Sequence, residues 1–234
     1  MKYILSICIF LHSVLILSQT TGIIVYNFSV LEDEKILKNE IIGRDFRKTI
    51  DAAKYAKFTL TFNDSISEFK NIQNMSLDGQ NIELALSISG VVKEIYTFKG
   101  TIYRNNSSEM FGENEYLIIE PLNKNWVLTS ESKKIDGYTC YKATNEYVVD
   151  NGKIFRHPVV AWFCPEIPIP YGPKGYGGLP GLILELQEWN IVFGAEKINL
   201  SNEDKLIILP TKGQTITNQE FNKKMRGSVR KKFE

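Results

Sequence analysis

The chain has 234 residues, of which 43% are hydrophobic and 24% charged, and this is the composition of an ordinary globular protein. Its formal net charge of +1 lacks the positive excess that nucleic-acid binding requires, so we expect no nucleic-acid partner. The sequence contains no internal repeat and no low-complexity linker, which favours one domain.

Residues 1–18 have the pattern of an export signal. Lys2 supplies positive charge, and residues 3–17 form an apolar run that is too short for a stable transmembrane span. Cys8 follows Ile7, whereas a lipoprotein signal needs a small residue before the cysteine. We therefore expect cleavage after Ser18, a protein of the periplasm or cell envelope, and no transmembrane span after cleavage.

Two cysteines, Cys140 and Cys164, remain after the signal. An even number in an oxidising compartment predicts one disulfide between them. The alternative is a pair of buried free thiols on neighbouring strands.

Alternation of apolar and polar residues with a period of two predicts most of the elements, and they are β-strands. In chain order the predicted strands cover residues 23–28, 58–62, 95–103, 116–119, 126–132, 138–149, 154–164, 182–188 and 191–200. The turn signals Asp136-Gly137 and Asn151-Gly152 predict hairpins between the strands on either side. The last two strands are expected to pair by turning near Trp189-Asn190.

Two segments have helical spacing instead. Residues 43–57 place Phe46, Ile50 and Ala53 on one face, which predicts an amphipathic helix packed on a sheet. Residues 218–233 predict a C-terminal helix or tail with Asn218 as N-cap and a basic cluster over 223–232. The polar stretch 71–80 is expected to be an exposed loop.

These elements predict a mainly β (α+β) fold, with a single β-rich domain over residues 19–234. We expect a curved antiparallel sheet, of which an open half-barrel is one form, crossed by the amphipathic helix. The concave apolar face of such a sheet must be filled by a helix or by a ligand.

A run rich in proline and glycine lies between Cys164 and Leu184. It cannot be helix interior or central sheet, so it predicts a shaped loop that leads into a buried strand. Aromatic residues in and around this loop are typical both of binding surfaces and of ordinary cores. The candidate ligand-binding residues are Trp162, Tyr171, Tyr176 and Trp189.

Residues 126–188 resemble the GLPGLI family, exported envelope proteins found mainly in Bacteroidetes. The resemblance rests on residues 126–144, on Ala161-Trp162-Phe163, and on the signature Gly178, Leu179, Pro180, Gly181, Leu182 and Ile183. It implies an envelope protein and no catalytic residues, because no activity is assigned to the family. It also makes Ser65 a candidate O-glycosylation site, since Asp64-Ser65-Ile66 fits the Asp-Ser/Thr-aliphatic sequon that Bacteroidetes use on exported proteins.

No motif in the sequence carries chemistry. His157 is the one histidine after the signal, and the G-x-S-x-G elbow of a serine hydrolase is missing. Cys140, His157 and Cys164 lack the spacing of a metal site, and the glycine run lacks the pattern of a phosphate loop. We therefore expect no metal and no cofactor.

The leading hypothesis is a non-enzymatic envelope protein that binds a hydrophobic small molecule or a partner such as an outer-membrane protein. The alternatives are a structural or assembly factor for outer-membrane machinery and a hydrolase with an unrecognised site. A deep apolar groove lined by Tyr176 and Trp189 favours the hydrophobic ligand. A filled core with an exposed edge strand favours the assembly factor, and His157 close to a carboxylate and a serine favours the hydrolase.

Overall fold

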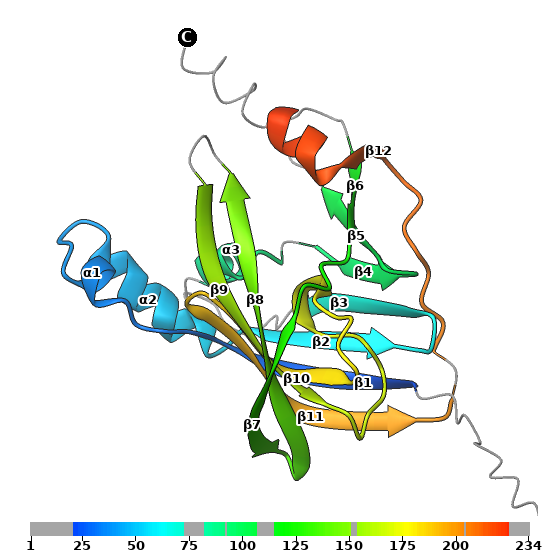
Figure 1. Ribbon diagram of the computed structural model, residues 1–234. Coiled ribbons are helices and arrows are strands. Elements are labelled where there is room, and N and C mark those ends of the chain that lie inside the picture. Colours follow the sequence, from blue (N-terminus) through cyan, green and yellow to red (C-terminus); the bar gives the residue numbers. More distant parts are fainter. Residues whose placement is uncertain are drawn as a thin grey trace, which may run out of the picture.

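A single large β-sheet dominates the computed structural model, which describes residues 21–72, 82–91, 93–106, 115–150, 154–203 and 205–224 (Figure 1). The predicted signal, most of the predicted 71–80 loop and most of the basic C-terminal cluster lie outside these residues. The mainly β fold predicted from the sequence is confirmed.

The sheet contains twelve strands among the described residues. They are β1 (Thr21–Val30), β2 (Lys57–Phe62), β3 (Ile66–Ile72), β4 (Ile95–Phe98), β5 (Thr101–Asn106), β6 (Tyr116–Pro121), β7 (Val127–Ile135), β8 (Tyr138–Asp150), β9 (Ile154–Cys164), β10 (Leu182–Glu188), β11 (Ile191–Ser201) and β12 (Gln214–Thr217). The helical elements are α1 (Glu34–Leu37), α2 (Gly43–Ala53), α3 (Ile82–Ser89), the single 3₁₀ turn η2 (Pro173–Gly175) and a helix over 218–224.

The strand order is β12-β6-β5-β4-β3-β2-β1-β11-β10-β9-β8-β7. The chain therefore forms two meanders, β2 to β6 and β7 to β11, and β1 joins them by pairing with β2 on one side and β11 on the other. All neighbouring pairs are antiparallel except β12 with β6, which is parallel. The predicted antiparallel sheet thus carries one parallel edge strand.

The connection between β6 and β7 requires the sheet to curl. These strands lie ten spacings apart in the sheet order, which is about 50 Å in a flat sheet. Residues 122–126 join them, and a link of five residues spans at most about 20 Å. The sheet therefore bends until its two ends approach each other, although β6 and β7 are not hydrogen-bonded and the sheet is not closed into a barrel.

The predicted hairpins are present. β7 pairs with β8 from Ile135 and Tyr138 onward, with Asp136 (φ 48°) and Gly137 (φ 83°) in the left-handed conformation of a two-residue turn. β8 pairs with β9 from Asp150 and Ile154 onward, and their turn lies outside the described residues. β10 and β11 turn at Trp189-Asn190, as predicted.

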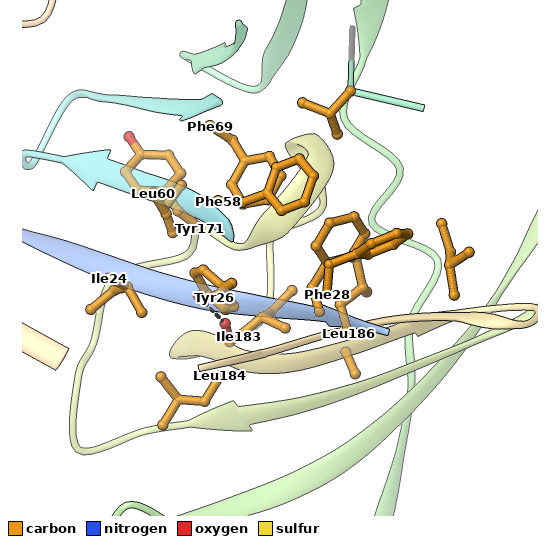
Figure 2. Close-up of a cluster of buried hydrophobic side chains, with 14 of the residues drawn as sticks. Ile24, Tyr26, Phe28, Phe58, Leu60, Phe69, Tyr171, Ile183, Leu184 and Leu186 are labelled. Atoms are coloured by element: carbon orange, nitrogen blue, oxygen red, sulfur yellow. Dashed lines mark hydrogen bonds between the residues drawn. The ribbon is translucent and has the colours of Figure 1, made fainter. Parts of the chain in front are cut away.

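The central strands bury one face and expose the other. Their inward side chains build an aromatic cluster in the concave face (Figure 2). The rings of Phe58 and Phe69 stack with their centres 5.6 Å apart, and Phe28 lies 5.1 Å from Phe193. The Tyr26 hydroxyl, fully buried, donates a hydrogen bond of 2.6 Å to the carbonyl oxygen of Ile183 on β10.

The helices differ from the prediction in extent and number. α2 ends at Ala53 rather than Lys57, because Lys57 already pairs with β1 as the first residue of β2. Its buried face packs against β1 and α3, two elements of the same core. α1 and α3 were not predicted. The C-terminal helix is capped by Thr217 rather than Asn218, since Thr217 and Glu220 exchange the two hydrogen bonds of a capping box.

None of the helices in the described ranges is both long and apolar enough to span a membrane.

Candidate functional site

Residues 165–181, called the plug below, fill the space inside the curled sheet. Ile167, Ile169 and Leu179 are buried in the same core cluster as the inward side chains of β1 and β2. The plug bonds to β10, because Ile183 N–H donates to Tyr171 O at 2.9 Å. The concave face is therefore filled by the protein's own plug rather than by a single crossing helix.

The plug also contacts the other end of the sheet. A Cβ added to Gly175, in η2, would lie 3.0 Å from Ile102 of β5 and 3.2 Å from Ile95 of β4. The plug thus bridges β10 and the β4–β5 hairpin, and only glycine leaves room for this approach.

The signature residues alternate between turn and anchor. Gly178 has a φ of 79°, and its N–H donates to Pro170 O at 2.9 Å. Gly181 has a φ of 158°, and a Cβ there would lie 2.2 Å from the carbonyl oxygen of Cys164. Leu179 and Leu182 are buried on either side of the exposed Pro180. The signature therefore turns the chain out of the plug and into β10.

A buried ion pair attaches the plug to the end of β10. Lys174 Nζ lies 2.5 Å from Glu188 Oε1, and the two side chains are 13% and 9% exposed. The Tyr176 hydroxyl donates to Glu188 Oε2 at 2.6 Å, so both carboxylate oxygens have a partner. Lys174 adopts a left-handed φ of 61°, a conformation that costs a lysine free energy and that the ion pair holds in place.

Burial controls the titration of this cluster. It lowers the pKa of Lys174, although the Glu188 carboxylate acts in the opposite direction. Burial, and next the charge of Glu188, raise the pKa of Tyr176. Arg104 on β5 lies close enough to affect both groups, and its own partner is Glu120 at 2.6 Å. The cluster is a set of matched charges inside the fold.

The connection over residues 122–126 holds the plug from outside. Trp126 Nε1 donates to Gly177 O at 2.9 Å, and the Trp126 ring packs edge-on against Tyr176 with centres 6.1 Å apart. The aliphatic part of Lys124 packs on Gly178, where a Cβ would lie 3.0 Å from Lys124 Cγ. The segment that forces the sheet to curl thus also encloses the plug.

An open cleft of about 500 Å³ lies where four segments meet. These are the β2–β3 turn, the β4–β5 hairpin, the connection 122–126 and the plug. Its lining residues are Asp64, Ser65, Thr97, Lys99, Gly100, Leu122, Lys124, Pro170, Tyr171 and Gly178.

The four predicted ligand-binding aromatics do not gather into one groove. Tyr171 is buried in the core and Tyr176 bonds Glu188. Trp162 instead lies beneath Lys133, whose Nζ is 4.4 Å from the ring centre. Trp189 is 47% exposed at the β10–β11 turn. Of the four, only Tyr171 lines the cleft.

The other side chains that could take part in acid–base chemistry or bind a metal are also separate from one another. The His157 ring packs on Trp189 with centres 4.7 Å apart, and among the described residues no hydrogen bond joins it to a serine or a carboxylate. Glu166 accepts a backbone hydrogen bond from Thr139, and Glu185 pairs with Lys133. Within the described ranges, no three histidine, cysteine or acidic side chains could hold a metal ion.

Cys140 and Cys164 are buried free thiols in the structure, and no disulfide joins them. Their predicted placement on adjacent strands is confirmed, because both adjoin the Tyr141–Phe163 pair of β8 and β9. Burial, and then the nearby Cys164, raise the pKa of Cys140 to about 12. Burial also raises the pKa of Cys164, so both thiols are protonated at neutral pH.

Apolar side chains are exposed at the end of the long β8–β9 hairpin, which projects beyond the neighbouring strands (Figure 1). Ile154 is 68% exposed, and Tyr147, Val148 and Phe155 are each nearly half exposed. These four residues, called the hairpin end below, include inward and outward positions of both strands.

Ser65, the candidate glycosylation site, is exposed in the β2–β3 turn, where its N–H donates to Asn63 Oδ1 at 3.0 Å. It lies on the wall of the cleft. Exposure meets one requirement for modification, and the modification itself stays a prediction.

The sequence analysis missed Lys174, Glu188 and the cleft lysines. A signal for Glu188 was present, because it follows the buried Leu186 at a spacing of two and so falls on the same face of β10. Lys99 and Lys124 carry no comparable signal, since they line one cleft only when the sheet curls.

Comparison with known proteins gives one short family match. A family model described as a protein of unknown function (Porph_ging) matches residues 155–185, which contain all of β9 except its first residue, the plug and the start of β10. The match falls within the stretch that resembles the GLPGLI family, and it does not confirm that name. None of the curated proteins matches the chain.

Among solved structures, PNGF-II in two crystal forms resembles the fold. The P21 form gives a TM-score of 0.50 and the C2 form 0.51, each at 14% identity over 90% of this chain. The chain spans about a third of the PNGF-II chains, 34% and 33%. At this identity the likeness concerns the fold alone.

Proposed function

We propose that the protein is an exported, non-enzymatic binding protein of the cell envelope, and that it binds a partner protein through the hairpin end. The observation that carries this proposal is the contrast between a filled interior and an exposed apolar projection. The plug fills the concave face, whereas four large apolar side chains project from β8 and β9. Exposed apolar clusters on stable proteins are typical of interaction sites.

The chemistry of the hairpin end favours an apolar patch on the partner. Its apolar residues lie on both faces of the hairpin. If the hairpin folded back on this protein's own surface, only one of these faces would be buried and the other would stay exposed to water. The ion pair between Arg156 and Glu146, at 2.7 Å, neutralises the charge beside them. Such an end suits insertion into an apolar groove with a polar rim.

The same features favour a partner over a hydrophobic small ligand. The candidate aromatics Tyr176 and Trp189 do not line a deep apolar groove, and Tyr176 is bonded to Glu188. An assembly role in outer-membrane machinery is one form of the proposed function. The edge strand β7 adds support, because no strand in the described part of the chain pairs with its outer side.

Site-specific photo-crosslinking in the envelope of the producing cell tests the proposal. A photoreactive amino acid replaces Phe155, and the control replaces Leu206, an exposed apolar residue on another segment. We expect one protein adduct at position 155 and none at 206. The partner identified in this way is then purified and its affinity measured.

The affinity of that partner should fall at least about tenfold for V148S/I154S, because buried apolar anchors dominate such interfaces. The matched control L206S/I208S should bind as the wild type, and both variants should melt normally because the residues are exposed. Adducts with lipid alone, or a partner whose affinity is unchanged in V148S/I154S, would overturn the proposal.

If the protein is exported, we expect a disulfide bond between Cys140 and Cys164. In an oxidising compartment the adjacent thiols of Cys140 and Cys164 can lose two hydrogen atoms to an oxidised dithiol carrier and form a disulfide. Thiol labelling of the denatured, unreduced protein from the envelope should then find neither cysteine free. Labelling of both would contradict the disulfide without bearing on the hairpin end.

A further inference from the structure

The cleft beside the plug has the features of a ligand site that is independent of the hairpin end. Its volume of about 500 Å³ falls within the range of pockets that hold small molecules. No residue of the hairpin end lines it.

Two backbone hydrogen bonds hold three of the four cleft segments in place. Leu122 N–H donates to Gly100 O at 2.9 Å, which fixes the connection to the β4–β5 turn. Gly178 N–H donates to Pro170 O, also at 2.9 Å, and holds the plug wall closed on itself. A preformed site loses little conformational entropy when it binds a ligand.

Its charges favour an anion. Lys99 and Lys124 line the cleft, and within the described ranges neither ammonium group forms an ion pair with a carboxylate. Lys99 occupies the β4–β5 turn with a φ of 47°, where asparagine or glycine is the ordinary choice. The left-handed backbone of Lys99 therefore costs free energy, and such strained conformations are often found at binding sites.

The remaining polar residues favour hydroxyl groups on the same ligand. Asp64, Ser65 and Thr97 offer oxygen atoms to the cleft, and Leu122 and Pro170 offer apolar surface. Asp64 lies near Tyr171, because its charge adds to burial in raising the pKa of that residue. A lining that combines one carboxylate, two hydroxyl groups and two ammonium groups suits a molecule that carries both hydroxyls and an anionic group.

We propose that the cleft binds a small hydroxylated anion, of the class that includes sugar phosphates and sugar carboxylates. Lys99 and Lys124 bind the oxyanion, Asp64 accepts hydrogen bonds from the hydroxyls, and the Ser65 hydroxyl donates to them or accepts from them. The shared chemistry is an oxyanion attached to a polyol, and the phosphate and the carboxylate are the two forms to be distinguished.

Backbone amide NMR during titration tests this site on the mature chain. The probes are glucose 6-phosphate and glucuronate, with glucose as the neutral control. We expect saturating shifts of Gly100 and Gly178 with at least one anionic probe and weaker or no binding of glucose. The preferred probe identifies the phosphate or the carboxylate form, and added salt should weaken its binding.

The variant K99Q/K124Q should lower the affinity for the preferred probe at least about tenfold, since each substitution removes one charge-assisted hydrogen bond between a lysine and the anion. K197Q/K212Q is the matched control, because it removes two exposed lysines outside the cleft. Equal melting temperatures for both variants would show that folding is intact. The proposal is overturned if no probe saturates, if glucose binds as well as the anions, or if K99Q/K124Q binds normally.

Discussion

Gly181 is the residue at which the plug returns to the sheet. The carbonyl of Cys164, the last residue of β9, occupies the space where its Cβ would lie, at 2.2 Å. Its neighbours Leu182 and Ile183 are fully buried, so the backbone cannot move away without opening the core. Because glycine has no side chain, the backbone at Gly181 can pass against the end of β9, and this allows the plug to join β9 to β10.

We predict that G181A destabilises the protein by at least about 1–3 kcal/mol, because backbone strain and a backbone clash act together. For a domain of this size each kcal/mol lowers the melting temperature by about 2–4 °C. G194A is the control, since a Cβ at Gly194 has open space and that residue lies in the same sheet. Equal melting temperatures for G181A and G194A would contradict the role of Gly181.

The plug as an element is held by one charged contact amid apolar packing. Lys174 and Tyr176 lie on either side of Gly175, and both reach the same carboxylate of Glu188 at the end of β10. Exposed pairs such as Lys38 with Glu34 contribute little, because water competes for both charges. Removing one member of the buried pair leaves an uncompensated charge inside the fold.

E188Q should therefore cost about 3–5 kcal/mol of unfolding free energy, measured by urea denaturation. E34Q, which breaks the exposed pair with Lys38, should cost no more than about 0.5 kcal/mol. The triple variant K174M/E188L/Y176F removes all three polar groups and should be more stable than E188Q alone. A triple variant no more stable than E188Q would indicate that packing, and not the unpaired charge, causes the loss.

At the scale of the whole molecule, the free energy of unfolding depends on pH because buried tyrosine side chains have raised pKa values. Burial, and next the charge of Asp64, raise the pKa of Tyr171 from 10.0 to about 12. Burial likewise raises the pKa of Tyr26, whose hydroxyl bonds β10 from within the core. The native state thus retains phenolic protons at pH values where the unfolded chain has lost them.

By linkage, a raised folded pKa means that this contribution to stability is complete below pH 10.0 and is lost as the pH rises toward about 12. We predict a falling free energy of unfolding across that window in urea titrations. Y171F should flatten the fall, and Y55F, which changes an exposed tyrosine, should not. An identical pH dependence in Y171F and the wild type would remove Tyr171 as a cause.

The sequence alone determined the local parts of this architecture. Asp136-Gly137 and Trp189-Asn190 are hairpin turns because the two strands that each one joins are adjacent in the chain and need no distant partner. Period-two alternation also identified β2, in which Phe58, Leu60 and Phe62 are buried on one face. The plug was predicted as a shaped loop because proline and glycine exclude regular structure there.

Tertiary structure decided what depends on distant pairing. Alternation shows which face of a strand is buried but not which strand lies beside it, so the insertion of β1 between β2 and β11 had no local signal. The plug's place in the concave face, the burial of Lys174 with Glu188, and the placement of Lys99 and Lys124 on one cleft all follow from the curl. That curl is imposed by a connection of five residues between strands ten spacings apart, a constraint that appears only once the strand order is known.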